Sequence, residues 1–492
     1  MASATPQAMV IGSILCADAA RALAALRAAP SGCAWVELRA DRLRADGVAH
    51  VVRAVDRPIL VSVRRVSDGG SFDGAEEERR ELLETALAAG AAAIDVEWDA
   101  PFAALAARPA LRERVILSHH GGPCRIDALR GLLARLAARA GGPAKLVPRA
   151  ARIDDVLALR AVLDEARRQG LRLVAFATGP AGTASRILAP AWGSWATYGS
   201  LARGRETAAG QLPVDELLEV YRVLEIGAPT RLYGLLGSAA SGSPSPAMHA
   251  AGYREAGIDA CYLPLETDDL AAGLDLARGL ALEALGVTQP FKEALAERCA
   301  PGDEAAARAG AVNTVRLAPV PLGFNTDGPA ALERVRRHLD PRGARVAILG
   351  AGGTARGFSA AFVAAGAEVT LFGRSAGRVE RAARQTGARA SALDALPTAP
   401  WDVLLQATPL GRDGARFFDP ARLSGRLVLD AVYAPQATAL VADARARGLA
   451  VVDGRELLAA QAVLQFERMT GRPARYETLH AVAEQWLERP AA

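Results

Sequence analysis

Eight short apolar runs rich in β-forming residues alternate with helical stretches rich in Ala, Leu and Arg between Met9 and about Gly227. The strand-like runs are MVIGSILC, AWVELRA, ILVSVR, AAIDVEW, RVILSHH, AKLVPRA, RLVAFAT and SWATYGS. Segments 76–89, 125–139 and 153–169 lie between them and carry apolar residues at helical spacing. This repeated alternation predicts a (β/α)8 TIM barrel, with an open doubly wound sheet as the alternative.

The length of 492 residues exceeds one ordinary core and predicts two or three domains. The formal charge of +4 is small and the basic residues are dispersed, so we expect no nucleic-acid partner. Five cysteines without paired spacing fit a reducing compartment. The N-terminus lacks a signal-peptide pattern and no apolar run is long enough to span a bilayer. We therefore expect a cytoplasmic protein without membrane contact.

Charged side chains interrupt the strand-like runs of the first half near the ends at which barrel chemistry collects. In chain order they are Glu37, Arg39, Arg64, Asp95, Glu97, His119, His120, Lys145 and, after the seventh run, Arg186. Any one of them could be a satisfied polar group at the barrel mouth. Their convergence on one rim favours an active site.

Lysine is almost absent from the chain. Of 58 basic residues only Lys145 and Lys292 are lysine, which leaves 58 − 2 = 56 arginines. Arginine stays protonated and is a poor nucleophile, whereas a lysine amine can form an imine or pass on a proton. The two lysines thus indicate two active sites, and a coding bias with two accidental survivors is the alternative.

Lys145 lies in the apolar run ProAlaLysLeuVal, where burial favours the neutral, nucleophilic amine. Its attack on a ketone would give an iminium ion that acidifies the neighbouring carbon. A histidine one strand away could take that proton and return it to a leaving hydroxyl, and arginines at the rim could bind a carboxylate.

These residues resemble the type I 3-dehydroquinate dehydratases. The match runs through GluLeuArgAlaAsp at 37–41, Arg64 with AspGlyGly at 68–70, SerHisHis at 118–120, Lys145, SerArg at 185–186 and ThrAlaAlaGlyGln at 207–211. The resemblance implies that Lys145 forms the Schiff base and His120 is the general acid/base. It implies that the substrate is bound by Glu37, Arg39, Arg64, Arg186, Thr207 and Gln211.

The chain departs from this family's pattern in three places. Asp68 stands where the family usually has Glu, Thr207 where it has Ser, and Gly121 where an acidic residue normally follows the histidine. His119 competes with His120 for the catalytic role. We prefer His120 because the family places its histidine third in the Ser-x-His string.

The second half contains a dinucleotide-binding signature at 345–357, ArgValAlaIleLeuGlyAlaGlyGlyThrAlaArgGly. An apolar strand runs into Gly350-x-Gly352-x-x-Ala355, and a helix follows from about Thr354, whose N-terminus would attract a pyrophosphate. The next strand ends in GlyArgSer and not in an acidic residue. Arg374, helped by Arg378, suits a 2′-phosphate, which favours NADP(H) over NAD.

Lys292 lies in GlyValThrGlnProPheLysGlu, where a solvated helix lysine would be the ordinary interpretation. Downstream, GlyAlaValAsnThr at 310–314 and GlyPheAsnThrAspGly at 323–328 offer side chains that can hydrogen-bond a polyol. A lysine and an aspartate sharing a site can exchange a proton with an alcohol while a nicotinamide carries the hydride.

These strings resemble shikimate dehydrogenase across residues 230–490. The resemblance implies the catalytic pair Lys292 and Asp327. It implies a shikimate site of Ser243, Ser245, Thr288, Asn313, Tyr433 and Gln461. The expected cofactor residues are Gly350, Ala351, Gly352, Gly353, Thr354, Ala355, Arg374, Ser375, Arg378 and Thr408, and no metal is expected. Gly286, Ala250 and Gln406 each stand where the family usually has Asn, and loss of the Asn at 286 could loosen the loop that carries Thr288 and Lys292.

We therefore predict a barrel at 1–227, a shikimate-binding α/β domain at 228–336, a Rossmann-like NADP domain at 337–455 and C-terminal helices at 456–492 that return to the substrate domain. Together the halves resemble the fused plant-type enzymes of the shikimate pathway, whose substrates are 3-dehydroquinate, 3-dehydroshikimate and shikimate. The alternatives are a catabolic quinate or shikimate dehydrogenase fusion using NAD and a non-catalytic metabolite sensor. We expect a monomer or a small homo-oligomer.

Overall fold

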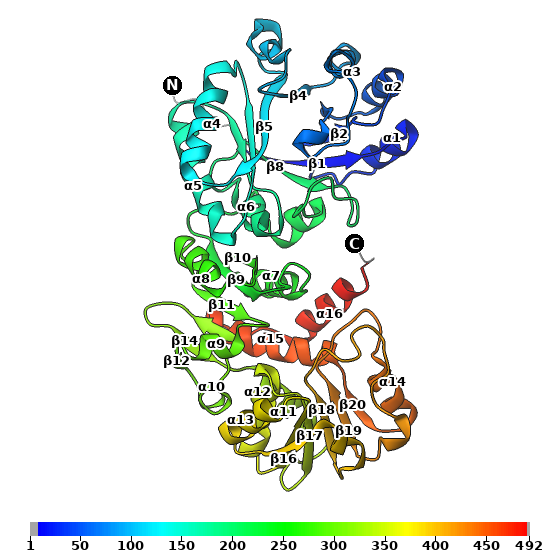
Figure 1. Ribbon diagram of the computed structural model, residues 1–492, viewed down its shortest axis with the longest axis vertical. Coiled ribbons are helices and arrows are strands. Elements are labelled where there is room, and N and C mark those ends of the chain that lie inside the picture. The colour runs from blue at the N-terminus through cyan, green and yellow to red at the C-terminus, as the bar shows by residue number, and fades with distance from the viewer. Residues whose placement is uncertain (1–7, 490–492) are drawn as a thin grey trace. The chain divides into compact units, whose positions relative to one another are not determined.

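The computed structural model describes residues 8–489, in two compact units (Figure 1). The first comprises residues 8–230 and 263–280, and the second comprises residues 231–262 and 281–489. The predicted limits at residues 1 and 492 lie outside the described residues, and the limits near 227, 336 and 455 stay predictions. No helix within residues 8–489 combines the length and the apolar character needed to cross a membrane.

The first unit contains an eight-stranded sheet in the order β7-β6-β5-β4-β3-β2-β1-β8, with the paired strands parallel. Its strands are β1 (Met9–Leu15), β2 (Trp35–Arg39), β3 (Ile59–Ser62), β4 (Ala93–Glu97), β5 (Val115–Pro123), β6 (Ala144–Arg149), β7 (Leu173–Ala175) and β8 (Ala196–Ser200). The amide of Trp195 donates to Leu173 O at 2.9 Å across the remaining gap between β7 and β8. The predicted barrel is confirmed, in a nearly closed form.

Helices follow most of the barrel strands. They are α1 (Ala19–Arg27), α2 (Ala45–Ala54), α3 (Glu76–Ala89), α4 (Ile126–Arg139), α5 (Leu157–Arg168) and α6 (Thr183–Leu188). Each of α1 to α5 buries an apolar stripe, such as Leu129, Leu133 and Leu136 of α4, which is the pattern of a helix packed on a sheet. The predicted segment 153–169 divides into a 3₁₀ turn, η4 (Ile153–Val156), and α5.

The second unit holds two six-stranded sheets. The first has the order β10-β9-β11-β13-β14-β12, in which β13 runs antiparallel to both neighbours. Its strands are β9 (Arg231–Gly237), β10 (Ala260–Glu266), β11 (Ala284–Val287), β12 (Ala300–Pro301), β13 (Thr314–Arg316) and β14 (Leu322–Phe324). The helices of this part of the chain are α7 (Ser245–Ala256), α8 (Leu270–Gly279), α9 (Lys292–Ala296), α10 (Glu304–Ala309) and α11 (Asp327–Arg336). Of these elements, α8 and the part of β10 from Leu263 on belong to the first unit.

The other sheet is wholly parallel, in the order β17-β16-β15-β18-β19-β20. Its strands are β15 (Arg345–Leu349), β16 (Glu368–Gly373), β17 (Arg389–Ala392), β18 (Val403–Gln406), β19 (Leu427–Asp430) and β20 (Ala450–Val452). The associated helices are α12 (Gly353–Ala364), α13 (Ala376–Thr386) and α14 (Ala439–Ala446). This 3-2-1-4-5-6 order is that of a Rossmann fold, which confirms the Rossmann-like sheet.

Two C-terminal helices, α15 (Gly454–Thr470) and α16 (Tyr476–Leu487), complete the second unit. Helix α15 contacts α7, α11 and β13, and α16 contacts α7. The two helices that follow the parallel sheet in the sequence thus pack on elements that precede that sheet. Gln461 on α15 thereby comes close to Asn313, which immediately precedes β13.

Candidate active sites

Lys145 on β6 lies inside the barrel with only 3% of its surface exposed. Its Nζ donates to Asp95 Oδ2 at 3.0 Å and lies 3.9 Å from Glu37 Oε1. It also stands 4.1 Å from the centre of the Tyr198 ring. Two carboxylates and an aromatic ring thus surround this buried amine.

Asp95 and Arg64 form the charged centre of this site. Asp95 Oδ1 accepts from Ser118 Oγ at 2.5 Å, and Oδ2 lies 3.2 Å from an Arg64 guanidinium nitrogen. Burial alone would raise the pKa of Asp95, but Arg64 and then Lys145 overcome it and hold that pKa below its ordinary value. Arg64 also lies 3.3 Å from Glu97, whose pKa is raised by burial. Asp95 is therefore an anion at neutral pH.

The two histidines of β5 have different surroundings. Burial, followed by the positive charges of Arg64 and Lys145, holds the pKa of His120 well below its usual 6.5. Its Nε2 is shielded from solvent and has no hydrogen-bond partner among residues 8–489. His119 instead accepts a hydrogen bond from Trp98 Nε1 at 3.0 Å through Nδ1. These surroundings support His120 as the proton-transfer group beside Lys145.

Arg186 is a buried guanidinium without a carboxylate partner in the described part of the chain. One terminal nitrogen donates to Ala209 O at 3.4 Å, Nε has no partner there, and Cζ lies 4.5 Å from the centre of the Phe176 ring. Burial lowers the pKa of Arg186 to about 9, so the group remains charged at neutral pH. A buried guanidinium of this kind can bind a substrate carboxylate by donating hydrogen bonds to it.

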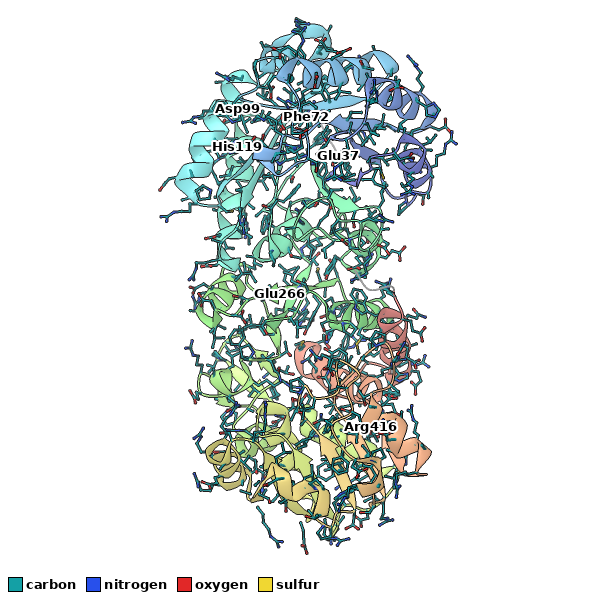
Figure 2. The ribbon with its side chains drawn as sticks, turned by 45° about the vertical axis from the view of Figure 1, so that its right-hand side comes forward. Glu37, Phe72, Asp99, His119, Glu266 and Arg416 are labelled. Atoms are coloured by element: carbon teal, nitrogen blue, oxygen red, sulfur yellow. The ribbon has the colours of Figure 1, made fainter. Side chains whose placement is uncertain are left out.

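The remaining expected substrate residues of the barrel are joined by hydrogen bonds. Arg39 donates to Asp41 at 3.1 and 2.7 Å and to Thr207 O at 3.4 Å. Gln211 Oε1 accepts from the Thr207 amide at 2.7 Å. Glu37 accepts from Ser62 Oγ at 2.9 Å and from Ser13 Oγ, and Figure 2 labels Glu37 and His119 in the barrel. Strands β1 to β3 and the segment after β8 thus meet in one network.

Sequence reasoning missed several residues of this site. Asp95 was named among the rim residues but given no role. Ser118 and Asp41 appeared only within motif strings, and Tyr198 was not singled out. Register carries the signal that could have found Ser118, because it pairs directly with Lys145 across β5 and β6. At Asp68, one of the departures from the family pattern, the carboxylate accepts from Arg65 Nε at 2.6 Å.

In the second unit Lys292 and Asp327 are in direct contact. Lys292 opens α9 and Asp327 opens α11, and Lys292 Nζ donates to Asp327 Oδ2 at 2.5 Å. Thr354 Oγ1 lies 3.0 Å from the same amine and 3.2 Å from the same carboxylate oxygen. Asn313 Nδ2 donates to Asp327 Oδ1 at 2.8 Å and lies 3.3 Å from Gln461 Oε1. Both oxygens of Asp327 are thereby fixed.

A cavity of about 280 Å³ lies against this pair. The expected shikimate residues and the Lys292–Asp327 pair all line it: Ser243, Ser245, Thr288, Lys292, Asn313, Asp327, Tyr433 and Gln461. Two of the expected cofactor residues, Thr354 and Thr408, line it as well. The structure therefore brings together side chains from β9 through α15. Hydroxyl, amide and charged groups surround one space, which suits a polyhydroxylated carboxylic acid.

Gly286, at which the family usually has Asn, leaves no empty space. A Cβ at this position would lie 2.1 Å from Tyr262 Oη and 3.2 Å from Gln465 Oε1. The neighbouring amide of Val287 donates to Asn313 O at 2.7 Å, and that of Thr288 donates to Leu236 O at 2.9 Å. The loop that carries Thr288 is thus held by backbone bonds and by side chains from other elements.

The glycine signature lies between β15 and α12. Gly350 has φ 128°, a conformation that favours glycine, and its Cβ would lie 3.1 Å from Ala407 O. A Cβ on Gly353 would lie 2.7 Å from Lys292 Cβ, so this glycine lets the helix N-terminus approach Lys292. Ala355 is fully buried, as close packing of helix on strand requires. This cradle fits a pyrophosphate.

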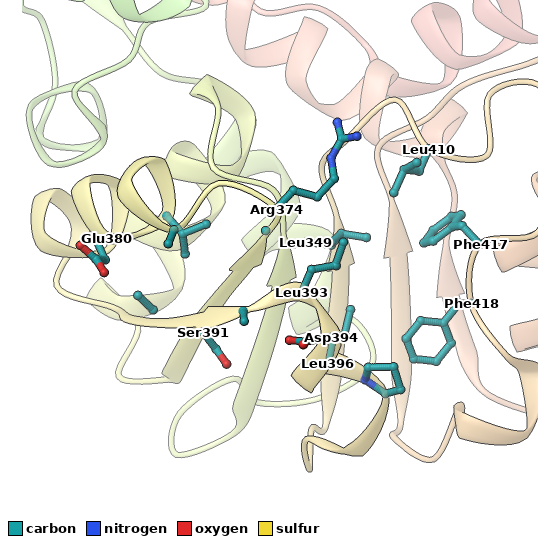
Figure 3. A pocket seen from close by; sticks show the side chains of 16 residues that line it. Leu349, Arg374, Glu380, Ser391, Leu393, Asp394, Leu396, Leu410, Phe417 and Phe418 are labelled. Atoms are coloured by element: carbon teal, nitrogen blue, oxygen red, sulfur yellow. The ribbon is translucent and has the colours of Figure 1, made fainter.

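A second cavity of about 710 Å³ opens beside the end of β16 (Figure 3). Arg374, Glu380, Leu393, Phe417 and Phe418 are among the residues that line it. Arg374 is exposed, so its guanidinium is free to meet a ligand. Apolar walls with an arginine at the edge fit a nucleoside that carries a phosphate. Of the other expected cofactor residues, Ser375 and Arg378 are exposed, and Thr408 donates to Gln406 Oε1 at 3.0 Å.

Two family models match the chain. The model described as type I 3-dehydroquinase covers residues 12–228, and the shikimate dehydrogenase substrate binding domain covers residues 235–315. A chloroplastic bifunctional 3-dehydroquinate dehydratase/shikimate dehydrogenase from Arabidopsis thaliana is 29% identical over 483 residues, which are 90% of this chain and 78% of the relative.

Further relatives match the second half. The NADP(+) shikimate dehydrogenase of Halobacterium salinarum is 38% identical over 263 residues, covering 51% of this chain and 97% of the relative. A solved shikimate 5-dehydrogenase from Thermus thermophilus, in complex with NADP(H) and shikimate, is 31% identical with a TM-score of 0.48 and covers 52% of this chain and 100% of that chain.

Proposed function

The chain belongs to the shikimate dehydrogenase family and carries a type I 3-dehydroquinase in its first half, and on this premise we propose that Lys145 serves the first reaction and the Lys292–Asp327 pair the second. The protein is a fused dehydroquinate dehydratase and shikimate dehydrogenase. It dehydrates 3-dehydroquinate to 3-dehydroshikimate and reduces that ketone to shikimate. The residue roles below are inferences from geometry.

In the first reaction, the Lys145 amine gives its lone pair to the ketone carbon, and the carbonyl oxygen leaves as water when the C=N bond forms. The iminium draws electrons from the neighbouring carbon. His120 can then take a proton from that carbon through its unpartnered Nε2 and return it to the hydroxyl that leaves as water. The depressed pKa of His120 supports this role, because the ring is neutral before it accepts the proton.

The single observation that carries the dehydratase assignment is the burial of Lys145 close enough to His120 to affect its pKa, with the Nε2 of His120 unpartnered among residues 8–489. Arg186 is a buried guanidinium without a carboxylate partner in the same residues. The substrate supplies what this site lacks. Its carboxylate would pair with Arg186, and its hydroxyls would reach Arg39, Glu37 and Gln211. Arg64 is already paired with Asp95 and Glu97, so its role is to fix those carboxylates.

In the second reaction, the Lys292–Asp327 pair moves a proton at the substrate oxygen. When bound, NADPH supplies the hydride for the carbonyl carbon. Lys292 is a hydrogen-bond donor that lines the cavity, and Asp327 and Thr354 hold its Nζ in place. Ser243, Ser245, Asn313 and Gln461 line the same cavity and would orient the carboxylate and hydroxyls.

The residues at the end of β16 support NADP(H) as the cofactor. Gly350 permits the tight turn, and open space at Gly352 would let a pyrophosphate approach the start of α12. Arg374 suits a 2′-phosphate because no acidic residue follows β16 directly. The relative from Halobacterium salinarum is NADP-dependent by its description. A cytoplasmic location and a monomeric or small homo-oligomeric state stay predictions.

Reduction with borohydride tests the dehydratase assignment. The intact chain is mixed with 3-dehydroquinate and borohydride, and peptide mass mapping locates the adduct. We expect it on Lys145, since only an imine nitrogen is fixed by this reagent, and no adduct with Lys145→Arg. An adduct elsewhere, or none in the wild type, would overturn the assignment. In the companion assay Lys292→Ala should lose NADPH-dependent reduction of 3-dehydroshikimate, and undiminished turnover would refute the second assignment.

A further inference from the structure

Asp95 is a buried carboxylate that the mechanism above does not use. It lies at the middle of β4, and three groups meet its two oxygens. Oδ1 accepts from Ser118 Oγ at 2.5 Å, while Oδ2 lies 3.0 Å from Lys145 Nζ and 3.2 Å from Arg64. Its side chain is completely shielded from solvent. A carboxylate so placed acts on the Lys145 nitrogen at short range.

The charge on that nitrogen is the same before and after imine formation. One ammonium and one ketone give one iminium and one water, so a single positive charge stays on Nζ. In between, the nitrogen must release a proton to become a nucleophile, and the departing oxygen takes up protons as it leaves. A counterion next to Nζ therefore stabilises the resting enzyme and the covalent intermediate alike, and in a buried site the charge is costly without one.

Asp95 is better placed for this task than the other nearby carboxylate. Glu37 Oε1 lies 3.9 Å from Nζ, and the oxygens of Glu37 already accept from Ser13 and Ser62. On another side, the face of the Tyr198 ring lies 4.1 Å from Nζ and offers a second surface that favours a cation. The groups around Nζ thus stabilise a positive charge both in the ammonium and in the iminium.

We propose that Asp95 is the counterion of the iminium formed at Lys145, and hence a further catalytic residue of the dehydratase. The proposal rests on the Schiff-base function assigned to Lys145. Arg64 and Ser118 keep the carboxylate turned toward Nζ. The pKa of Asp95, held low by Arg64 and Lys145, agrees with an anion that persists through the reaction.

The test measures covalent adduct and turnover in Asp95→Asn, which keeps the shape of the side chain and removes its charge. The full chain is used without NADPH, so that the second reaction stays idle. We expect the borohydride-trapped adduct on Lys145 and kcat for dehydration both to fall roughly 100-fold or more, because the buried cation loses its partner. Asp95→Glu, which restores the charge, should recover part of both.

Glu97→Gln is the matched control. It removes a carboxylate of the same strand that also pairs with Arg64, but Glu97 makes no contact with Lys145 that the structure records. We expect its adduct yield to fall clearly less than that of Asp95→Asn. An equal loss in both variants would overturn the proposal, because the effect would then come from freeing Arg64.

Thermal unfolding and binding of 3-dehydroquinate show whether Asp95→Asn is folded. A folded Asp95→Asn with wild-type adduct and turnover contradicts the proposal. If that variant does not fold, Ser118→Ala removes the 2.5 Å bond that orients Asp95, and its adduct yield should fall; an unchanged yield also contradicts the proposal. Absence of adduct in the wild type, by contrast, refutes the Schiff-base assignment itself.

Discussion

Arg186 illustrates how burial prepares a single residue for a ligand. The guanidinium keeps one backbone acceptor at 3.4 Å and packs on Phe176, and its charge is compensated by no carboxylate of residues 8–489. We expect Arg186→Gln to lower kcat/KM for 3-dehydroquinate roughly 10- to 100-fold, mainly through KM, because a buried hydrogen bond to a charged group is lost. Steady-state kinetics of the dehydratase measure this.

Arg186→Lys is the control for charge alone. It keeps the cation but loses the two parallel donors of a guanidinium, so it should recover only part of the affinity. If Arg186→Gln leaves KM unchanged, the substrate carboxylate binds elsewhere.

We expect His120, as the proposed general base, to set the acidic limit of the dehydratase. Its pKa lies well below 6.5 because of burial and the charges of Arg64 and Lys145. A general base works while it is neutral and is lost when pH falls through its pKa, so the depressed pKa moves that loss to lower pH. We expect kcat/KM to show no fall between pH 7 and about 6.5 that follows histidine titration. A pH profile with an acidic limb centred at the ordinary histidine value would contradict this prediction.

The identity of rare residues was enough to predict part of each candidate site. Lysine scarcity pointed to Lys145 and Lys292, and both are buried or half-buried beside carboxylates. The partners were harder to predict, because Asp95 and Tyr198 belong to ordinary strand patterns. Which of their faces points inward, and at what height in the barrel, depends on strand register, and one chain read alone does not give the register.

At the scale of elements, periodicity predicted the long helices and the strand count. The segment 76–89 is helical over the expected range as α3, whereas β7 keeps only Leu173–Ala175 of the expected run 172–178. Apolar composition alone does not show where a strand ends, because residues beyond the strand can remain buried, as Phe176 and Ala177 do. Element type was therefore predictable where amphipathicity was strong, and boundaries were not.

In strand β11, side chains from neighbouring elements fill the space beside Gly286. Gly286 faces Tyr262 Oη, which would lie 2.1 Å from an added Cβ. We expect Gly286→Asn to cost about 1 to 3 kcal/mol of unfolding free energy, because the extra volume enters a packed core. Removal of the hydroxyl in Gly286→Asn with Tyr262→Phe should return part of that loss. A double-mutant cycle by thermal or denaturant unfolding measures the coupling, and additive effects would show that the two positions do not compete for space.

At the scale of the whole molecule, the recorded contacts of Lys145 and of Lys292 within residues 8–489 each stay within one unit. Lys145 contacts Asp95, Glu37 and Tyr198, all in the first unit. Lys292 contacts Asp327 and Thr354, both in the second. Each site is thus assembled from its own unit, and the product of the first reaction is the ketone that the second reduces. The two sites can therefore work independently if 3-dehydroshikimate diffuses from the first to the second.

Lysine-to-arginine variants test this independence, because arginine keeps the positive charge but forms no imine and gives up no proton at neutral pH. Lys145→Arg should lose at least about 1,000-fold in dehydration and retain reduction of 3-dehydroshikimate, and Lys292→Arg should show the reverse. Neither variant alone should turn 3-dehydroquinate and NADPH into shikimate at an appreciable rate. An equimolar mixture should do so after a lag, since the intermediate released by one chain can be reduced by the other. Absorbance of NADPH follows the reaction, and a mixture that stays inactive while both partial reactions persist would show that the intermediate must be passed on within a single chain.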